Sequence, residues 1–597
     1  MTYFRRDKFS GLSPAVAPRL LADQFGQSAQ NIDFESGSIV PIKIDLTLTS
    51  NFGTSTGLAD GSKHSIYLYT HTDGNNYWLQ WNNDYIKVVE GPIPGDSLGR
   101  LYWTGETYPK MSVASVIKNS NGGPWPTSSY RLGIPAPAAA PSVTISGTQD
   151  NDVSPEDASW VYTFVSVYGE EGPPSPATTA ATFTPSTQTA TFTNIPNYGG
   201  SGQNFGSGAL KRIYRSNTGS TNTQFQFVKE IAYATTSSDS SVTDQVSAAT
   251  LGEVLPSETW IEPPNDDSST YPDGPLQGLI PVANGVFAGF TGKRLCFSEA
   301  YMPHAWPVAY RITIEEDIVA IGSTSNGVVC LTNGKPYFVT GVEPSVMTAI
   351  QIDLAQACVN KYSVVDMGDY LLYAGQDGLC AISGSQGEVV TNRVISPAQW
   401  NSDYYPTAIK AFKHEGTYVA FWIDGDNEGG WVFDPRNSGE SALSTITIDN
   451  PVKGGWYNSQ DGELYIISGS SANEIQKYRG GATNRTALWK SKKYVVPKPI
   501  SMAWVHMSAA SFPNSGTLNK VRVWADGTLL ADYTISYSSN VYTQITSTPG
   551  SISNATLREP VMRLPSTLAK EWEVEVSGVV TLEEVCLSQN INEIKAT

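Results

Sequence analysis

The sequence has few of the residues that metal binding and catalysis most often use. Among its 597 residues there are five histidines and five cysteines, and only 16% of the residues are charged. No two histidines stand at metal-ligand spacing and no cysteines form a Cys-x-x-Cys pair, so the sequence does not predict a zinc site. The cysteines are predicted to be buried free thiols of a protein assembled in a reducing cytoplasm, in preference to a disulfide framework. They are Cys296, Cys330, Cys358, Cys380 and Cys586.

The sequence also lacks a basic excess and long apolar runs. Lys and Arg number 38 against 56 Asp and Glu, which gives a net charge of −18. Proteins that bind duplex DNA normally carry a basic surface, because contacts with phosphates supply most of the affinity. No run of about 18 apolar residues occurs, and the N-terminal stretch has no apolar segment of signal-peptide length. The sequence therefore predicts neither a membrane span nor secretion by the ordinary route.

One modest concentration of basic residues occurs late in the chain, at Lys490, Lys492, Lys493 and Lys498. Lysines are often placed along exposed strand edges, where their charge prevents pairing with other chains. This explanation is preferred to a binding site for a polyanion.

Glycine, proline and aromatic residues are abundant instead. There are 53 Gly, 37 Pro, 30 Tyr and 15 Trp, and the chain is dense in Ser, Thr and Asn. Helix-rich enzymes usually carry more Glu, Lys and Ala. The composition therefore favours a β-rich particle or surface protein, whose outer faces are made neutral by hydroxyl and amide groups.

One short phrase recurs between residues 284 and 481. Each copy is a Gly in a turn-like setting followed by mostly apolar, β-branched or aromatic residues, which predicts a tight hairpin leading into a strand. Two or more hairpins in every 40 to 50 residues are typical of a β-propeller blade. The repeat lacks the Trp-Asp and Gly-His signatures of the best-known blades, so a generic antiparallel β-protein is the alternative. The glycines are Gly285, Gly327, Gly378, Gly416 and Gly462, at intervals of 42, 51, 38 and 46 residues.

Changes in composition divide the rest of the chain. Pro-rich borders and a Ser- and Thr-rich strand series predict an inserted fibronectin-like β-sandwich, and strict alternation after the repeats predicts a C-terminal β-sandwich. The fold class is therefore all-β, a degenerate β-propeller with these two additions. The expected domains are an irregular leader with a strand-like end (1–50), the first propeller blades (51–135), the inserted β-sandwich (136–265), the main blades (266–483) and the C-terminal β-sandwich (484–597).

Two loops have the residues of a known site but the wrong surroundings. Gly53 to Gly57 fit Gly-x-Ser-x-Gly, but a nucleophile elbow needs a strand before it and a helix after it, and a Ser/Thr/Gly loop surrounds this one. Asp424, Asp426 and Glu428 alternate as in a calcium loop, yet the twelfth position is Pro435 in place of Glu. A solvated hairpin turn is favoured over a weak calcium site.

The remaining candidates also favour structural explanations. Glu315, Glu316 and Asp317 could supply a carboxylate pair for glycoside hydrolysis, but a charged turn or a subunit contact explains them better. His304 lies between Pro303 and Trp306, which indicates packing. No phosphate or dinucleotide loop is present. The sequence therefore predicts no catalytic residue, no cofactor and no metal, and the chain is not expected to be an enzyme.

Two stretches resemble a known family. The first 50 residues contain a Gly-x-Ser-Pro opening, a Pro-Arg-Leu-Leu segment, a Gln-rich bridge and then Asn-Ile-Asp-Phe-Glu-Ser-Gly, Asn31 to Gly37. This order resembles the start of the tail tubular, or nozzle, proteins of podophages. Phe297 to Pro307 (FSEAYMPHAWP) is similar to a phrase that recurs among phage virion proteins. Each motif covers under 40 residues, and neither is catalytic.

The resemblance implies a structural role in the tail of a virion. A nozzle protein would form a homohexameric ring docked below a tail adaptor ring, with fibres or spikes at its flank. Genomic DNA would pass through the lumen without specific binding, which the acidic balance favours. The expected location is the virion tail, after assembly in the host cytoplasm and without stable membrane insertion. A receptor- or glycan-binding tail protein, or a depolymerase, is the alternative.

Overall fold

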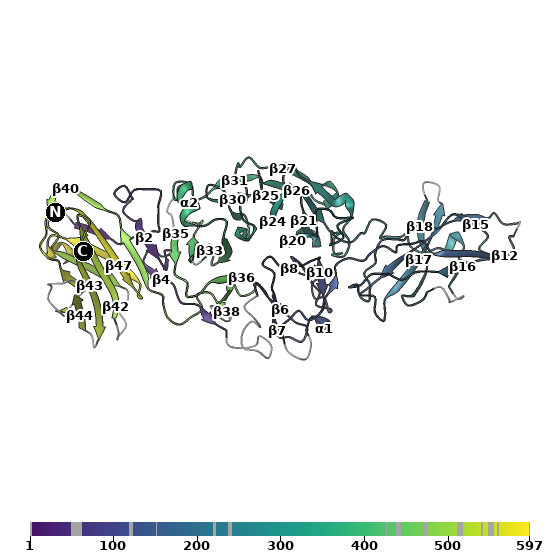
Figure 1. Ribbon diagram of the computed structural model, residues 1–597, viewed down its shortest axis with the longest axis horizontal. Coiled ribbons are helices and arrows are strands. Elements are labelled where there is room, and N and C mark those ends of the chain that lie inside the picture. Colours follow the sequence, from purple (N-terminus) through teal and green to yellow (C-terminus); the bar gives the residue numbers. More distant parts are fainter. Residues whose placement is uncertain are drawn as a thin grey trace. The chain divides into compact units, whose positions relative to one another are not determined.

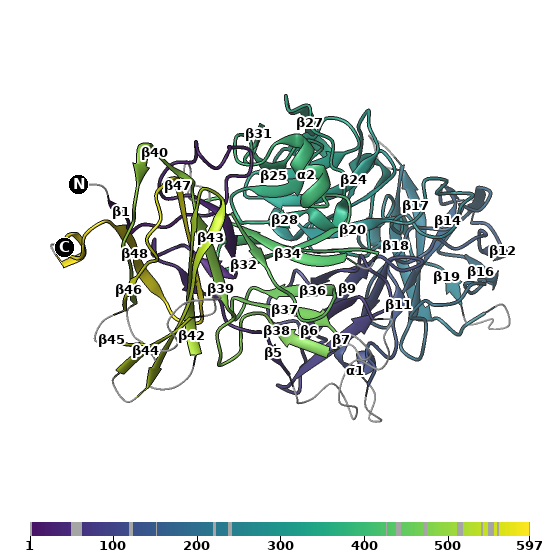
Figure 2. The same cartoon turned by 60° about the vertical axis from the view of Figure 1, so that its left-hand side comes forward.

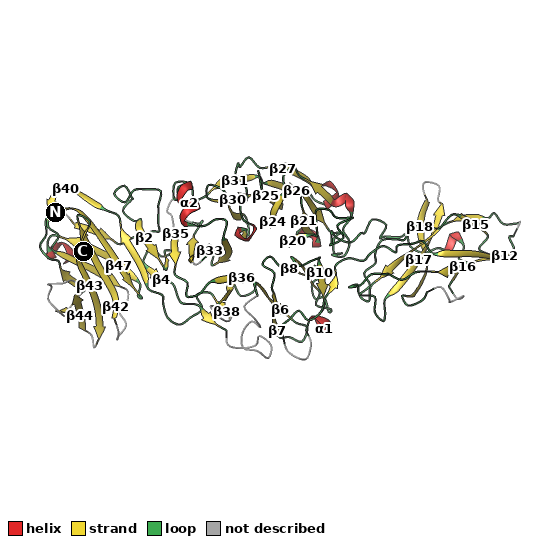
Figure 3. Ribbon diagram, viewed as in Figure 1, coloured by secondary structure: helices red, strands yellow, loops and turns green. Residues whose placement is uncertain are grey.

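The computed structural model describes residues 3–48, 63–118, 123–150, 152–218, 223–236, 242–425, 427–436, 443–469, 474–509, 517–538, 541–546, 555–557 and 560–595. The structure is 47% strand and 6% helical, which confirms the all-β class (Figure 3). The described α-helices are short: α1 (Ala114–Ile117), α2 (Pro397–Asp403) and α3 (Ile591–Lys595). Within the described part of the chain, no helix has the length and apolar character needed to cross a bilayer.

The chain forms two compact units, one made of residues 1–66, 334–336 and 352–597 and the other of residues 67–333 and 337–351. The second unit contains three four-stranded antiparallel sheets that follow one another along the chain (Figure 1). Their strands are β8 (Lys87–Glu90), β9 (Leu101–Thr104), β10 (Lys110–Ser112) and β11 (Tyr130–Arg131); β20 (Gln277–Pro281), β21 (Phe287–Thr291), β22 (Arg294–Phe297) and β23 (Arg311–Thr313); and β24 (Ile318–Thr324), β25 (Gly327–Thr332), β26 (Tyr337–Thr340) and β27 (Thr348–Gln351).

The first unit contains three further groups of four antiparallel strands, the middle one of which continues into a larger sheet. They are β28 (Val365–Asp366), β29 (Leu371–Ala374), β30 (Leu379–Ser383) and β31 (Gln386–Val389); β32 (Ile409–His414), β33 (Thr417–Asp424), β34 (Asn427–Phe433) and β35 (Leu443–Ile446); and β36 (Val452–Asn458), β37 (Glu463–Ser468), β38 (Glu474–Lys477) and β5 (Leu46–Thr47). β6 (Ser65–Thr70) and β7 (Asn76–Trp81) form a two-stranded sheet.

Apolar faces join these sheets within each unit. In the second unit, Tyr102 of β9 and Phe287 of β21 share a core, and Phe290 of β21 and Val328 of β25 share the next. In the first unit, Leu372 of β29 and Tyr418 of β33 lie in one core. The opposite face of the β32 to β35 strands, which includes Val419 of β33, packs on Leu464 and Ile466 of β37. Strands with apolar residues on both faces explain why the sequence shows continuous apolar runs here, in place of strict alternation.

The recurring glycines open strands as expected, with one difference in register. Gly285, Gly327, Gly416 and Gly462 precede or begin the second strand of a sheet, whereas Gly378 precedes β30, the third strand. The glycine at the equivalent turn, between β28 and β29, is Gly368, with a φ of 107°. Replacing Gly378 by Gly368 changes the intervals to 42, 41, 48 and 46 residues. The repeat is thus more regular in the structure than in the sequence phrase.

The C-terminal residues form two sheets that pack on one core (Figure 2). Val574 and Val576 of one sheet and Val505 and Leu587 of the other lie in this core. The larger sheet continues from β35 through β2 (Gly26–Gln30) into β39 (Ala487–Ser491), β47 (Ala569–Gly578), β42 (Thr517–Ala525), β43 (Thr528–Ser538), β44 (Val541–Thr546) and β45 (Ala555–Leu557), and β40 (Tyr494–Ile500) also pairs with β47. The smaller sheet has the order β1 (Tyr3–Arg6), β48 (Leu582–Ser588), β41 (Trp504–Ala509) and β46 (Val561–Arg563).

The N-terminal leader is built into sheets formed by much later residues, so the prediction of an irregular leader is wrong. β1 pairs with β48, β2 lies between β35 and β39, and β5 completes the sheet of β36 to β38. β3 (Ile32–Asp33) and β4 (Val40–Pro41) form a small hairpin of their own. The pairings of β1, β2 and β5 could not be read from local patterns, because each strand is short and its partner lies more than 400 residues away.

A lobe with its own core interrupts the second unit. Its core combines Trp160, Phe164, Phe183, Phe192 and Ile213. Its strands are β12 (Ser142–Gly147), β16 (Gln188–Asn194) and β19 (Thr243–Asp244) in one sheet, β14 (Trp160–Val165), β17 (Leu210–Thr218) and β18 (Thr223–Ala232) in another, and the pair β13 (Glu156–Ala158) and β15 (Ala181–Phe183).

The lobe also contacts the sheet of β8 to β11. The Tyr168 and Tyr130 rings lie 6.2 Å apart, and the Arg131 N–H donates to the Gly202 carbonyl at 2.8 Å. A Cβ on Gly172 would lie 2.5 Å from Ile134, so this contact needs glycine. The inserted lobe is therefore held at its base by direct packing as well as by its Pro-rich connections.

Candidate functional site

The richest group of titratable side chains lines a cavity of about 350 Å³ in the first unit. Four segments build it: the turn between β32 and β33, the start of β37, the end of β38, and the β3–β4 hairpin of the leader. We call it the charged pocket. Its ionisable residues are Asp33, Lys43, His414, Glu415, Glu463, Lys477, Tyr478 and Arg479.

Opposite charges face one another across the charged pocket. The Arg479 guanidinium lies 3.4 Å from an Asp33 oxygen and 3.8 Å from a Glu415 oxygen. Lys477 pairs with Glu463 at 2.7 Å. Glu415 and Arg479 have left-handed backbones, with φ of 46° and 55°. Such backbones cost free energy for residues other than glycine and often occur at functional positions.

His414 is the buried member of the charged pocket. Its ring packs edge-on against Tyr478, with centroids 5.0 Å apart, and its Nδ1 has no hydrogen-bond partner among the described residues. Burial, together with the nearby charges of Arg479 and Lys477, lowers the pKa of His414 to about 3. The ring is therefore neutral near pH 7. Its pKa lies far below that pH, so it would be a weak general base there.

The charged pocket can therefore bind a polar group but does not assemble a catalytic arrangement. Its carboxylates are balanced by cations in ion pairs, and no nucleophile lies beside an activating base there. In the parts of the chain that the structure describes, no cluster of three His, Cys, Asp or Glu side chains could hold a metal ion.

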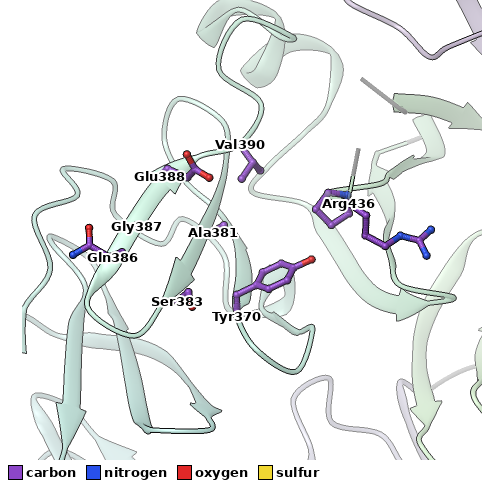
Figure 4. Close-up of a pocket in the computed structure, with 9 residues that line it drawn as sticks. Tyr370, Ala381, Ser383, Gln386, Gly387, Glu388, Val390 and Arg436 are labelled. Carbon is purple, nitrogen blue, oxygen red and sulfur yellow. The ribbon is translucent and has the colours of Figure 1, made fainter. Parts of the chain in front are cut away.

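A larger cavity, of about 490 Å³, lies between the sheet of β28 to β31 and the segment after β34 (Figure 4). In Figure 4, Tyr370 and Arg436 come from separate segments on two sides of this space, and Glu388 lies on β31. Arg436 is already engaged, because its Nε and Nη2 both donate to the Asp434 carboxylate at 2.9 Å. The cavity therefore offers one tyrosine and one exposed carboxylate beside apolar walls.

A third cavity, of about 350 Å³, belongs to the inserted lobe. The aromatic rings of Tyr214 and Phe227 line it, 5.9 Å apart. The Arg212 guanidinium bonds to Glu171 at 2.8 Å and to Glu230 at 2.9 Å. Glu171 also accepts from the Tyr214 hydroxyl at 2.7 Å. We call this third cavity the lobe pocket. It combines aromatic faces with charged groups that are held in ion pairs.

Among the sequence-derived candidate residues that the structure describes, none lies beside a second catalytic group. Asp424 ends β33 and Asn427 begins β34, so this loop is a two-residue hairpin with Gly425 at a φ of 60°. Glu428 lies on β34 and is exposed, while Asp426 is outside the described residues. The hairpin explanation of this loop is confirmed at the positions that are described.

The other candidates lie in turns or in the core. Glu315 and Asp317 are exposed in the connection from β23 to β24, where the Glu315 carbonyl accepts from Lys293. His304 is packed edge-on against Trp260 at 5.9 Å, and burial lowers its pKa to about 4. The Gly-x-Ser-x-Gly segment, residues 53–57, lies outside the described residues.

The five cysteines are buried and free, as the sequence predicts. Burial raises the pKa of Cys330, Cys358 and Cys380 to about 12 and that of Cys296 and Cys586 to about 11. Their thiols are therefore poor nucleophiles near neutral pH.

The explanation of the lysine concentration as an edge guard is wrong for Lys490, which lies inside a sheet, whereas Lys498 lies on β40, a strand that pairs only with β47. Lys490 belongs to β39, which has β2 on one side and β47 on the other. It pairs with Glu573 at 2.7 Å, and Lys493 pairs with Glu571 at 2.9 Å. Lys492 pairs with Asp23 at 3.1 Å. Neighbouring carboxylates thus neutralise most of this basic group.

The two family-like motifs form turns that are partly buried. Asn31 is 3% exposed with a φ of 58°. Its side-chain amide donates a hydrogen bond to the hydroxyl of Thr447, the residue after β35. The Trp306 ring nitrogen donates to the Pro303 carbonyl at 2.7 Å, and the Ser298 hydroxyl accepts from the Phe287 N–H at 2.9 Å. The residues that carry the resemblance therefore mainly shape the fold, and among them only Asp33 lines one of the three cavities, the charged pocket.

In sequence comparisons, neither a protein-family model nor a curated protein matches this chain. Solved structures similar to it include the WD40 domain of Toxoplasma gondii coronin, at 9% identity over 75% of this chain and 88% of that one, with a TM-score of 0.24. Kluyveromyces lactis Hsv2 is 8% identical over 59% and 96%, with a TM-score of 0.23. Dihydro-heme d1 dehydrogenase NirN is 10% identical over 72% and 78%, with a TM-score of 0.22. These scores are too low to support any functional argument.

Proposed function

We propose that this chain is a structural subunit of a short-tailed phage, a tail nozzle protein that forms a ring around the channel for DNA ejection. In this proposal the four-stranded sheets are blades of one degenerate β-propeller. The inserted lobe is a fibronectin-like β-sandwich and the C-terminal sheets are a second sandwich. Six copies form the ring, dock below an adaptor ring and hold fibres or spikes. The protein is located in the virion tail after assembly in the host cytoplasm.

The observation that carries the proposal is the position of the residues that resemble this family. Asn31 to Gly37 form the β3–β4 region, where Asp33 accepts from the Glu35 N–H at 2.9 Å and Ile32 and Phe34 are buried. A motif that builds a turn and joins distant strands supports a structural role more than a catalytic one. The neutralised lysines and the net charge of −18 support a lumen that does not retain DNA.

The decisive experiment is a cryo-electron microscopy map of intact particles, together with mass spectrometry of purified virions. We expect the chain at six copies in the tail, with its four-stranded sheets arranged around the channel. Absence of the chain from virions would contradict the proposal. Three copies at the tip of a fibre would support the receptor-binding alternative instead.

The lobe pocket favours that second candidate, a receptor- or glycan-binding tail protein. Aromatic faces such as that of Phe227 can stack on sugar rings, and Arg212 with Glu230 could bond to hydroxyl groups. Isothermal titration of the purified chain with surface polysaccharides of candidate hosts tests this role. Binding that is lost in Phe227→Ala, with the fold retained, would favour it. Release of reducing ends during incubation would indicate a depolymerase.

A further inference from the structure

Four large apolar side chains are exposed together in the second unit, and we call them the valine patch. They are Val308 (61% exposed), Val342 (79%), Val346 (62%) and Ile350 (47%). Val308 begins the 3-10 helix η3 (Val308–Tyr310) and Val346 ends η4 (Pro344–Val346), and these two helices contact one another. Ile350 belongs to β27, the last strand of its sheet. Single exposed apolar residues are normal, but a connected group of this kind marks an interaction site.

Acidic residues flank the valine patch. The Tyr310 hydroxyl donates to Glu299 at 3.4 Å, and burial, followed by the charges of Glu299 and Glu343, raises the pKa of this tyrosine. Glu299 thus lies beside Tyr310 of η3, and Glu343 immediately precedes η4, the helix that contacts η3. Residues 299–310 and 337–351 contain no Lys or Arg. The partner that fits this surface should be apolar at its centre and basic at its margin.

One surface of the first unit has this chemistry. β40 reads Tyr-Val-Val-Pro-Lys-Pro-Ile, and its Val495 is 56% exposed. Val495 pairs with Glu571 and Ile500 with Ala569, which places Leu568, 73% exposed, at the end of the same strand pair. We call residues 494–500 with Leu568 and Lys570 the proline strand.

The proline strand is basic and has free hydrogen-bonding capacity. Lys498 and Lys570 are exposed, and neither has a carboxylate partner among the residues that the structure describes. The register of β40 on β47 is broken between Val495 and Ile500, where Pro497 and Pro499 supply no N–H. An interrupted edge of this kind resists open-ended strand pairing but leaves apolar and basic side chains available for a specific partner.

We propose that the valine patch of one copy of this chain docks on the proline strand of a second copy. The valine patch cannot pair well with itself, because Glu343 and Glu299 would then face their own counterparts. Contact between two different surfaces is heterologous, and such contacts generate rings or filaments in place of two-fold dimers. This inference depends on the ring-forming role proposed above and names the residues that would make the contact.

The test measures assembly of the purified full chain by sedimentation velocity and native mass spectrometry over a range of concentrations. Val346→Glu and Leu568→Glu should each weaken association by at least about tenfold, because each buries a charge at an apolar contact. Val153→Glu, at a 44% exposed valine of the inserted lobe, is the matched control and should assemble as the wild type does. Circular dichroism and thermal unfolding check that every variant is folded.

A charge exchange adds specificity to the test. Glu343→Lys and Lys498→Glu should each weaken association, and the double variant should recover most of it. Unchanged assembly of Val346→Glu and Leu568→Glu would overturn the docking surfaces while leaving a ring formed through other faces. A wild-type chain that stays monomeric at every concentration would overturn the contact itself. The role in the virion is decided separately by the particle map.

Discussion

Asn31 and Thr447 are 416 residues apart in the chain and are joined by hydrogen bonds on both sides of one amide. The side-chain oxygen Oδ1 of Asn31 accepts from the Thr447 N–H at 2.9 Å, and Nδ2 of the same amide donates to the Thr447 hydroxyl at 2.8 Å. Nδ2 also donates to the Thr486 carbonyl at 3.0 Å. Thr447 follows β35 and Thr486 precedes β39, so this side chain fixes the leader between two later strands.

Asn31→Ala should lower the free energy of unfolding of the first unit by roughly 2–5 kcal/mol. The variant leaves buried polar groups without partners, at about 1–3 kcal/mol, and forces alanine into a left-handed backbone, at about 1–2 kcal/mol. Asn31→Gly is the matched control, because it loses the same bonds without the backbone strain. Urea unfolding followed by tryptophan fluorescence measures both. Equal stability of Asn31→Ala and wild type would show that the amide does not hold the leader.

Gly462→Ala should destabilise the chain by about 1 kcal/mol through backbone strain alone. The φ of Gly462 is 75°, and an added Cβ would meet no atom within 4 Å. Gly462→Asn should be less harmful, because asparagine tolerates this conformation better. Gly199→Ala is the control, since that glycine is equally open but has no left-handed φ. Thermal unfolding measures the stability of the three variants. A loss in Gly462→Ala that is absent from Gly199→Ala is due to backbone strain.

Acidification should destabilise the first unit through His414. An unfolded histidine titrates near pH 6.5, whereas folding lowers the pKa of His414 to about 3. Between these values the unfolded state binds the extra proton, so stability falls as the pH drops below about 6.5, by roughly 2 kcal/mol at pH 5. His414→Phe keeps a ring against Tyr478 and should flatten this dependence between pH 7 and pH 5. An unchanged pH profile of the variant would assign the acid sensitivity to other groups.

The purified chain should show no detectable binding to short DNA duplexes at physiological salt. The basic residues Lys490, Lys492 and Lys493 are held in ion pairs, and the net charge is −18. Charges that face DNA across water interact over about 8 Å at this ionic strength. Fluorescence anisotropy at two salt concentrations measures this. Micromolar binding with a steep salt dependence would reveal a basic channel and contradict the proposal that DNA passes through the lumen without being retained.

The five thiols should react with a maleimide only after unfolding. All are buried, and burial raises their pKa to about 11 or 12. The thiolate, which is the reactive form, is therefore scarce at pH 7. Mass spectrometry after labelling with and without urea counts the modified sites. Rapid labelling of Cys586 in the native protein would indicate that the β1–β48 edge opens.

The sequence predicted what local signals encode. Gly before an apolar run marks a hairpin, so the strands after Gly285, Gly416 and Gly462 were found, and the all-β class followed. Burial of the cysteines and of His304 followed from their apolar surroundings. The arrangement of whole blades into one propeller, and the role in a phage tail, remain predictions.

Long-range pairings were not predictable from the same signals. Nothing local distinguishes β2, with the sequence Gly-Gln-Ser-Ala-Gln, from a polar loop, and its partner β39 begins at Ala487. Lys490 looked like an edge residue because its partner Glu573 lies 83 residues later, on another strand. The charged pocket was missed for the same reason, since Asp33 and Arg479 meet only in the folded chain. Arg479 and Glu415 could not be recognised as left-handed, because neither is the Gly or Asn that usually adopts this backbone.

The pairing of Tyr3 with Ser588 has a consequence for synthesis on the ribosome. Translation proceeds at about 5–20 residues per second, so β1 waits roughly half a minute to two minutes before β48 emerges. During this interval β1 has no partner strand, although the partners of β2 and β5 are synthesised earlier, and a nascent chain cut short before residue 569 would also lack β47. Completion of the first unit therefore comes long after β1 is synthesised, and a chain that terminates before β48 exposes unpaired strand edges to its neighbours.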